Sequence, residues 1–214
     1  MKILSSDLNQ METRYRATLI NSLSGVKSAN LVGTVDGKKN ENLSIVSSCF
    51  HLGANPALMG LIFRPAEVER HTFENIMEMK FFTLNHVNQT IIEKAHQTSA
   101  RYPKEISEFK ATGLQSVYLD QFQAPFVKEA NIKIGLQLVQ NIHLEVNKTE
   151  FVIGEIKFIE LPEKILMPDG FVDIVTAESI GVTGLDSYHR LFPGDRYSYA
   201  KPDRPLKKLN LNGQ

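Results

Sequence analysis

A hairpin signal followed by a hydroxyl-rich strand places the strongest constraint on how this chain can fold. Residues 31–35 form a strand-like apolar run, and Asp36-Gly37 follows it directly. A D-G dipeptide between β-like runs is typical of a tight hairpin turn. Residues 43–50 then resume the β-like pattern, and residues 58–63 form a second, almost wholly apolar run after a break at Asn55-Pro56. The pattern predicts antiparallel strands joined by short turns.

The strand predicted over residues 43–50 carries more hydroxyl groups than a core strand needs. Ser44, Ser47 and Ser48 stand between apolar residues in this segment. One interpretation is a strand whose hydroxyls simply face solvent. The other is a strand that presents hydroxyls and backbone N–H groups to a polar ligand. Spacing alone leaves both interpretations open.

The spacing of apolar residues and the positions of turn residues predict further helices and strands. Residues 17–26 predict a short helix ending at Gly25, Thr72 is a candidate N-cap of another helix, and Thr90 to Glu93 form a capping-box pattern that predicts a helix to residue 99. A third short helix is expected over residues 104–111. Strands are expected at 80–87, 114–122, 132–138, 143–146 and 150–161. Strands on both sides of a block of short helices predict one antiparallel barrel with inserted helices.

Composition limits the function classes. The 214 residues carry 24 basic and 24 acidic side chains, so no global field attracts nucleic acid or an anionic membrane surface. The single cysteine, Cys49, excludes an internal disulfide framework and fits a reducing compartment. No segment has the apolar length of a signal h-region or a membrane span. We therefore expect a soluble cytoplasmic protein.

Several common catalytic patterns are absent from the sequence. The histidines show no metal-ligand spacing with one another or with Cys49, which we expect to be a buried, inert thiol. No G-x-S-x-G nucleophile elbow accompanies the serines. The glycine pattern at residues 181–184 lacks the third glycine of a dinucleotide fingerprint. We expect no metal site, and any nicotinamide substrate would bind without a Rossmann fold.

Polar and basic residues gather around the helix start predicted at Thr72: Arg64, Arg70, Thr72 and Asn75. Helix N-termini attract anions, and arginine adds bidentate phosphate recognition. Together with the hydroxyl-rich strand, this segment suits a phosphorylated ring ligand. The alternative is a solvated face on which both arginines pair with nearby glutamates, namely Glu67, Glu69 and Glu74.

The order of these motifs resembles the flavin reductase-like, FMN-binding split-barrel family. That family often reads N-L-A-P-x-S-F-F, N-P-P, K-D-T-x-x-N-I and E-F-V-V-N along the chain. The corresponding stretches here are NLSIVSSC at 42–49, NPA at 55–57, RHTFENI at 70–76 and KFFTLN at 80–85. Later matches are EFKATGL at 108–114, GEI at 154–156 and YHRL at 188–191. The resemblance runs from about residue 20 to residue 200.

The resemblance implies a mainly β fold with short helices, an antiparallel split β-barrel that spans residues 17–200. Residues 1–16 would form an N-terminal arm and residues 201–214 a C-terminal tail. The family is homodimeric, with flavin near the subunit interface. The implied function is an FMN-binding oxidoreductase of the NAD(P)H:flavin reductase type, with NADH or NADPH as electron donor and a small-molecule substrate. A non-catalytic flavin-binding or electron-transfer module is the alternative.

The resemblance also assigns residues to the cofactor. Flavin itself carries the redox chemistry, so no catalytic side chain is required. His189 and Arg190 would border the flavin or the nicotinamide. The residues expected to bind FMN are Asn42, Ser44, Ile45, Val46, Ser47, Ser48, Arg64, Arg70, Thr72 and Asn85. This chain differs from the family pattern at Ser44-Ile45, Ser48-Cys49 and His71.

Overall fold

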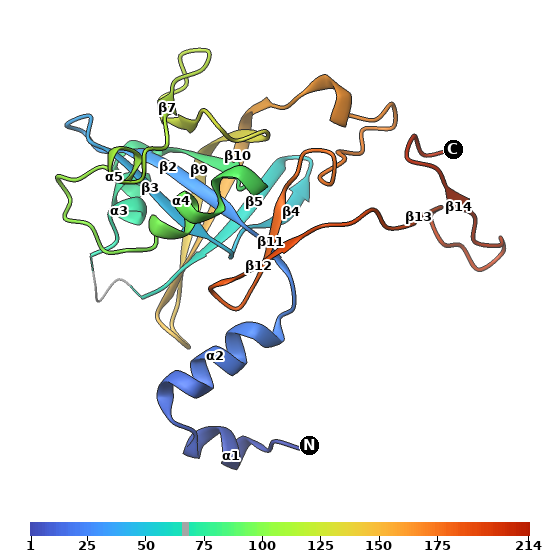
Figure 1. Cartoon of the computed structure of the whole chain (residues 1–214), viewed down its shortest axis with the longest axis horizontal. Coiled ribbons are helices and arrows are strands. Elements are labelled where there is room, and N and C mark those ends of the chain that lie inside the picture. Colours follow the sequence, from blue (N-terminus) through green and yellow to red (C-terminus); the bar gives the residue numbers. More distant parts are fainter. Residues whose placement is uncertain (66–68) are drawn as a thin grey trace.

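The computed structural model describes residues 1–65 and 69–214. A seven-stranded sheet, in which every neighbouring pair is antiparallel, forms the body of the molecule (Figure 1). Its strand order is β3-β2-β6-β9-β10-β5-β4, and a smaller sheet has the order β1-β11-β12. The prediction of a mainly β, antiparallel split barrel with short helices is confirmed.

The strands are β1 Lys27–Ser28, β2 Asn30–Val35, β3 Glu41–Val46, β4 Phe50–Ala54, β5 Ala57–Phe63, β6 Phe81–His86, β7 Ser116–Val117, β8 Phe126–Val127, β9 Lys133–Leu144, β10 Thr149–Glu160, β11 Ile180–Thr183, β12 Ser187–Arg190, β13 Arg196–Tyr197 and β14 Lys208–Leu209. The helices are α1 Ser5–Gln10, α2 Thr13–Leu23, α3 His71–Met79, α4 Ile92–Gln97 and α5 Glu108–Thr112, with 3-10 turns at Gln89–Ile91 and Glu163–Ile165. None of the helices in the described ranges is long and apolar enough to cross a membrane.

Strand β2 is buried on both of its faces. Adjacent side chains in a strand point to opposite faces, so Leu31 and Val32 enter different cores. Val32 packs with Phe82 and with Ile76 of α3 in one apolar cluster. Leu31 packs in a second cluster with residues of α4, α5 and β11. Helices α4 and α5 and the small sheet therefore cover the Leu31 face of this strand, and α3 packs on the Val32 face.

The hairpins that the sequence predicted are present, with one correction. β2 and β3 pair around the Asp36-Gly37 turn, and β9 and β10 pair around the turn at Asn147-Lys148. The single strand predicted over residues 43–50 is wrong, because β3 ends at Val46 and β4 begins at Phe50. The three residues between the two strands, 47–49, leave the sheet ladder and turn the chain toward the opposite edge of the sheet.

Two predicted helix caps are wrong. The N-cap of α3 is Arg70 rather than Thr72, and Thr72 lies in the first turn. The segment at Thr90 begins with a 3-10 turn whose N-cap is Asn88, which accepts a hydrogen bond from the Thr90 N–H. In both places a residue two positions upstream is the N-cap, and the hydroxyl that resembled a cap takes a different partner.

Two segments are shorter than the sequence predicted. The helix expected over residues 104–111 is α5, Glu108–Thr112, and it ends at Gly113 in the left-handed conformation with φ of +70°. Glycine adopts this conformation without steric cost. The strand expected over residues 114–122 is reduced to β7, because the chain bends after Val117 and positive φ angles at Asp120 and Gln121 break the extended backbone.

Both ends of the chain extend away from the barrel (Figure 1). The predicted helix at 17–26 starts earlier, at Thr13, so the expected arm at 1–16 contains α1 and the first turn of α2. Neither of these helices buries a residue. The hairpin of β13 and β14 extends in another direction, to the right in Figure 1, whereas α1 and α2 lie below the barrel. The proposed division into arm, domain and tail stays a prediction.

Candidate functional site

A cleft of about 820 Å³ opens where β3, the start of α3, the loop after α4 and the turn between β11 and β12 converge. Its volume falls within the range of about 300–1,000 Å³ that is typical of cofactor and small-ligand sites. The walls are mostly polar near α3 and include apolar side chains such as Ile45, Val46, Phe63 and Val182. This combination suits a ligand with a flat apolar part and a charged end.

The cleft brings together most of the residues that the sequence singled out. The lining residues predicted from sequence are Asn42, Ser44, Ile45, Val46, Ser47, Ser48, Arg64, Arg70 and Thr72. Three further predicted residues, Asn85, His189 and Arg190, do not line it. Their side chains lie elsewhere for reasons that the local structure makes plain.

Asn85 is a core residue of β6. Its side-chain amide donates to the Leu31 carbonyl and to the Thr83 hydroxyl, and its Oδ1 accepts from the Val127 N–H. The residue has no exposed surface. Its amide group therefore joins the β6 strand to β2 and β8 and is not available to a ligand in the cleft.

His189 and Arg190 were predicted at the rim, but Tyr188 takes that place. Strand β12 alternates its side chains between two faces. Tyr188 lines the cleft, whereas His189 contacts the hydroxyl of its neighbour Ser187. The Tyr188 hydroxyl lies 2.8 Å from Nδ1 of His96, which comes from α4, and the two rings meet edge to face. Burial and the nearby Asp186 carboxylate raise the pKa of Tyr188, so its hydroxyl remains protonated at neutral pH.

The hydroxyl groups of the cleft wall are held by hydrogen bonds. The Thr72 and Ser44 hydroxyl oxygens lie 2.8 Å apart, and the Asn42 side-chain amide donates to Thr72 Oγ1 at 2.8 Å. Ser48 donates its hydroxyl to the Ile62 carbonyl at 2.8 Å, which anchors the segment after β3 to β5. Ser44 and Ser48 thus differ in role, because the Ser48 hydroxyl hydrogen is used within the protein.

Arginine side chains also line the cleft: Arg64, Arg70 and Arg101. Burial, together with the positive charges of Arg64 and Arg101, lowers the pKa of Arg70. The Nε atom of Arg70 and the Nε2 atom of His71 are buried, and within the described parts of the chain neither has a hydrogen-bond partner. Positive charges gathered in this way, with no acidic partner among the described residues, indicate a site for an anion.

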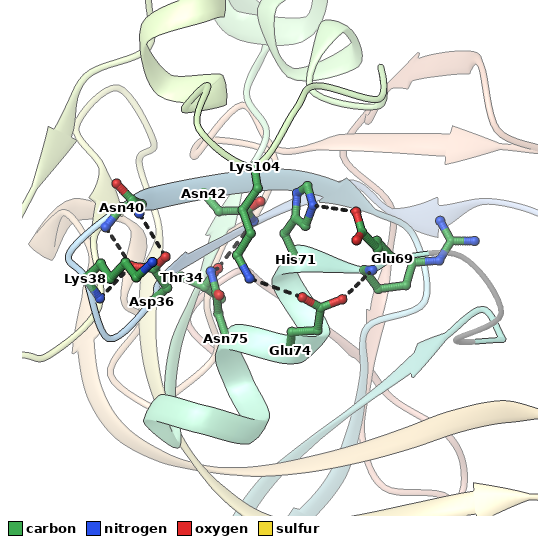
Figure 2. A network of polar contacts seen from close by, with 11 residues as sticks. Thr34, Asp36, Lys38, Asn40, Asn42, Glu69, His71, Glu74, Asn75 and Lys104 are labelled. Carbon is green, nitrogen blue, oxygen red and sulfur yellow. Dashed lines mark hydrogen bonds and ion pairs between the residues drawn. The ribbon is translucent and has the colours of Figure 1, made fainter.

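Two of the glutamates that were expected to neutralise the arginines, Glu69 and Glu74, pair with other groups (Figure 2). Glu74 accepts a hydrogen bond from the Arg70 backbone N–H and forms an ion pair with Lys104 at 3.4 Å. The Glu69 carboxylate lies 3.7 Å from His71 Nε2. Glu67 is outside the described residues. Within the described ranges, neither Arg64 nor Arg70 makes an ion pair with Glu69 or Glu74, which favours the anion-binding interpretation over the solvated face.

Two more charged residues shape the cleft. Glu108 of α5 accepts a hydrogen bond from the Leu43 N–H at 2.9 Å, and burial raises the pKa of its carboxyl group. Lys27 donates to the Asn21 carbonyl and to the Gly184 carbonyl, each at 3.2 Å. This ammonium group joins the end of α2 to the turn between β11 and β12, and all these segments border the cleft.

Sequence reasoning missed Lys27, His96, Arg101, Glu108 and Tyr188. His96 lies in α4, and Arg101 follows that helix. The sequence predicted the helix from its capping pattern, and nothing in the spacing of the two residues connects them to Arg70. Glu108 and Tyr188 lie within stretches that matched the family pattern, at 108–114 and 188–191. That overlap is the signal that could have nominated both residues.

Cys49 is half-buried, and burial raises the pKa of its thiol to about 12. A thiol of this kind stays protonated at neutral pH and is a poor nucleophile. Among the described residues, no group of three histidine, cysteine, aspartate or glutamate side chains is arranged to hold a metal ion.

The match to a family model covers most of the barrel. Residues 23–172 match the flavin reductase-like domain. The chain belongs to the flavin reductase-like family. A protein of Aquifex aeolicus (strain VF5) without an assigned function is 27% identical over 123 residues, which is 58% of this chain and 62% of that protein. The match thus spans under two thirds of that relative's length.

Solved structures show the same fold. A protein of Shewanella frigidimarina NCIMB 400, provisionally named a flavin reductase with split barrel domain, is 54% identical with a TM-score of 0.90, covering 94% of this chain and 100% of that one. Nitrilotriacetate monooxygenase component B from Bacillus cereus is 22% identical with a TM-score of 0.80, over 91% and 98% of the two chains. An FMN-binding protein from Thermus thermophilus is 16% identical with a TM-score of 0.65, over 77% and 86%.

Proposed function

We propose that this protein is an FMN-binding oxidoreductase of the NAD(P)H:flavin reductase type. The observation that carries the proposal is the cleft of about 820 Å³, whose lining combines hydroxyl groups with arginines that form no ion pair with Glu69 or Glu74. A phosphorylated ring ligand needs both features. The flavin reductase-like family of the chain makes FMN the best candidate for that ligand.

The arginine side chains would hold the phosphate. Arg64, Arg70 and Arg101 supply fixed positive charge, and the buried Nε of Arg70 and Nε2 of His71 are polar atoms that a phosphate oxygen would satisfy. The sequence did not single out Arg101, and it is included because its side chain lines the cleft. An FMN phosphate carries up to two negative charges near neutral pH, which makes the pairing selective for the phosphorylated flavin.

The rest of the cleft would hold the ring and the ribityl chain. Ile45 and Val46 offer apolar contact, while Ser44 and the backbone of residues 44–48 offer hydrogen bonds. When bound, FMN supplies the hydride and electron transfer. The protein's part is to orient the ring, to hold the phosphate and to leave room for a nicotinamide, and Tyr188 with His96 would border that space instead of His189 and Arg190.

We further propose a homodimer in the cytoplasm. Support for the dimer comes from the apolar side chains that α1, α2 and the segment between them and β1 expose, such as Leu4, Tyr15, Leu23 and Val26. Exposed apolar surface of this kind is common at protein interfaces. The single cysteine supports a reducing compartment.

The test is a flavin titration followed by a turnover assay. Purified protein should quench FMN fluorescence on binding, and it should oxidise NADH or NADPH in the presence of FMN. Protein that binds no FMN at micromolar concentration would rule the proposal out. Tight FMN binding with negligible NAD(P)H oxidation would instead select the alternative, a flavin-binding or electron-transfer module.

A further inference from the structure

A line of buried polar side chains runs from the cleft into the barrel, and it ends at residues to which no role in binding has been assigned. Asn75 of α3 donates from Nδ2 to Thr34 Oγ1 at 3.1 Å. Asn42 of β3 donates to the same Thr34 oxygen at 3.3 Å and to Thr72 Oγ1 at 2.8 Å. Thr72 contacts Ser44 at 2.8 Å. Figure 2 shows Thr34, Asn42 and Asn75 facing one another.

Most of this line is sealed from water. Thr34 has no exposed surface, and the exposed fractions of Asn75, Thr72 and Asn42 are 2%, 7% and 8%. Buried polar groups rarely lack partners, and in a network of low dielectric each hydrogen bond constrains the next. Ser44 is half-buried, and it lines the cleft together with Asn42 and Thr72.

Counting donors fixes the direction of the two hydrogen bonds that Asn42 makes. A carboxamide nitrogen has two hydrogens, and Asn42 uses both, one on Thr34 and one on Thr72. Thr72 therefore acts as acceptor toward Asn42, and its single hydroxyl hydrogen is free to point at Ser44. Either hydroxyl can be the donor of the bond between Thr72 and Ser44, and when Thr72 donates, the Ser44 hydrogen is left for an acceptor in the cleft.

We propose that Asn42, anchored by Thr34 and Asn75, is a positioning residue that makes the Ser44 hydroxyl a hydrogen-bond donor toward an acceptor atom of the bound flavin nucleotide. Asn42 thus acts on the ligand through Thr72 and Ser44. The inference rests on the proposed FMN site, and it predicts a specific consequence of reversing the direction of the network.

Asn42→Asp is the substitution that reverses it, because the two side chains have nearly the same shape. An ionised carboxylate only accepts, so Thr72 would turn its hydrogen toward position 42 and Ser44 would turn its hydrogen toward Thr72. Ser44 would then present a lone pair to the acceptor atom of the ligand. A protonated carboxyl group at position 42 restores one donor, so acid should partly restore binding.

The experiment measures FMN dissociation constants of the full-length protein by fluorescence at pH 8.5 and pH 5.5. Because the FMN phosphate also titrates, the quantity compared is the ratio of Asn42→Asp to wild type at each pH. We expect a loss of about tenfold or more at pH 8.5 and a clearly smaller loss at pH 5.5. Asn147→Asp is the matched control, since Asn147 lies in the exposed β9–β10 turn and uses its Oδ1 only as an acceptor.

A double-mutant cycle separates this role from a loss of stability. Ser44→Ala and Thr72→Val should each weaken FMN binding, and their effects should be strongly non-additive, because both remove the same donor. The same should hold for Ser44→Ala with Asn42→Asp. If Asn42→Asp does not fold, the cycle of Ser44 with Thr72 decides the question.

The outcomes distinguish the inference from the proposed function. Wild type that binds no FMN contradicts both. Wild type that binds FMN, with an Asn42→Asp ratio near one or a ratio that does not change with pH, contradicts the positioning role alone. Additive effects in the cycle also contradict it. A pH-dependent ratio together with non-additive effects supports it.

Discussion

The interior of the barrel and the cleft beside it are built on the same strands but satisfy opposite requirements. In the interior, Phe82, Leu84 and Leu136 have no exposed surface, and a Cβ atom added at Gly154 would lie 2.6 Å from the Phe82 ring. In the cleft, about 820 Å³ is open, and charged groups such as Arg70 have polar atoms without partners in the described chain. The interior is filled by the protein's own side chains, whereas the cleft has the space and the polar groups to bind a ligand.

The difference shows which residues contribute to the stability of the fold and which contribute to ligand binding. Packing in the interior lowers the free energy of the folded state through apolar burial. The arginines of the cleft repel one another, so they lower stability and become favourable only when an anion is present. Substitutions in the two regions should therefore have effects on different quantities, and the following experiments test that separation.

The largest effect is expected from Phe82→Ala. Removing a fully buried phenyl ring leaves a cavity and costs about 3–5 kcal/mol of unfolding free energy. Urea denaturation followed by circular dichroism measures this change. Val146→Ala, at a position that is 91% exposed, is the control and should change stability by less than about 0.5 kcal/mol. Similar losses for both variants would contradict the assignment of stability to the interior.

Acid should destabilise the protein through His86. Burial lowers the pKa of this imidazole to about 4, while its Nδ1 lies 3.0 Å from the Ser179 hydroxyl. The unfolded chain binds a proton near pH 6.5 and the folded chain does not, so stability is full above that pH and falls by roughly 2–3 kcal/mol as the pH drops toward 4. Unfolding free energies measured from pH 8 to pH 4 test this. His86→Gln should flatten the curve, whereas His51→Gln should leave it unchanged.

Arg70→Ala should weaken FMN binding by about 2 kcal/mol, close to thirtyfold, without loss of stability. Riboflavin, which lacks the phosphate, should bind the variant and the wild type about equally. Fluorescence titrations with both flavins measure the two affinities. Arg190→Ala is the control, because that arginine does not line the cleft. An equal loss for riboflavin would show that Arg70 acts on the ring or on the fold.

A smaller effect is expected from Glu108→Gln. Burial raises the pKa of this carboxyl group, so the folded state holds its proton more tightly than the unfolded state. Ionisation of Glu108 therefore lowers the free energy of unfolding as the pH rises through the raised pKa of its carboxyl group. The amide can still accept the Leu43 N–H hydrogen bond, so the variant should be slightly more stable at pH 7 and no more stable at pH 4. The prediction is wrong if the gain in unfolding free energy of Glu108→Gln over wild type is larger at pH 4 than at pH 7.

Much of the barrel could be predicted because its signals are local. The Asp36-Gly37 turn and the alternation of Ile134 and Leu136 in β9 determine hairpin positions within a few residues. The hydroxyl-rich segment and Arg70 were also found by local chemistry. Asn85 shows the limit of that approach, since an asparagine at the end of a strand looks the same whether it binds a ligand or joins two strands of the core.

The missed residues are those that only the fold brings together. Arg101 and Arg70 meet because the loop after α4 returns to the start of α3. Tyr188 replaces His189 at the rim because the register of β12 with β11 decides which side chain faces the cleft. A shift of one residue in a strand exchanges its two faces, and the sequence of β12 contains polar residues on both.

The bond network of Lys27 has a consequence for motion. Helix α2 buries none of its side chains, yet the Lys27 ammonium ties its Asn21 carbonyl to Gly184 at the edge of the cleft. Amide hydrogens of α2 should exchange with solvent far faster than those of β2, because little packing opposes local unfolding. A ligand that contacts Asn21 should slow that exchange. The rate of amide exchange in α2 would then show whether a ligand occupies the cleft, although the helix lines that cleft only through Asn21.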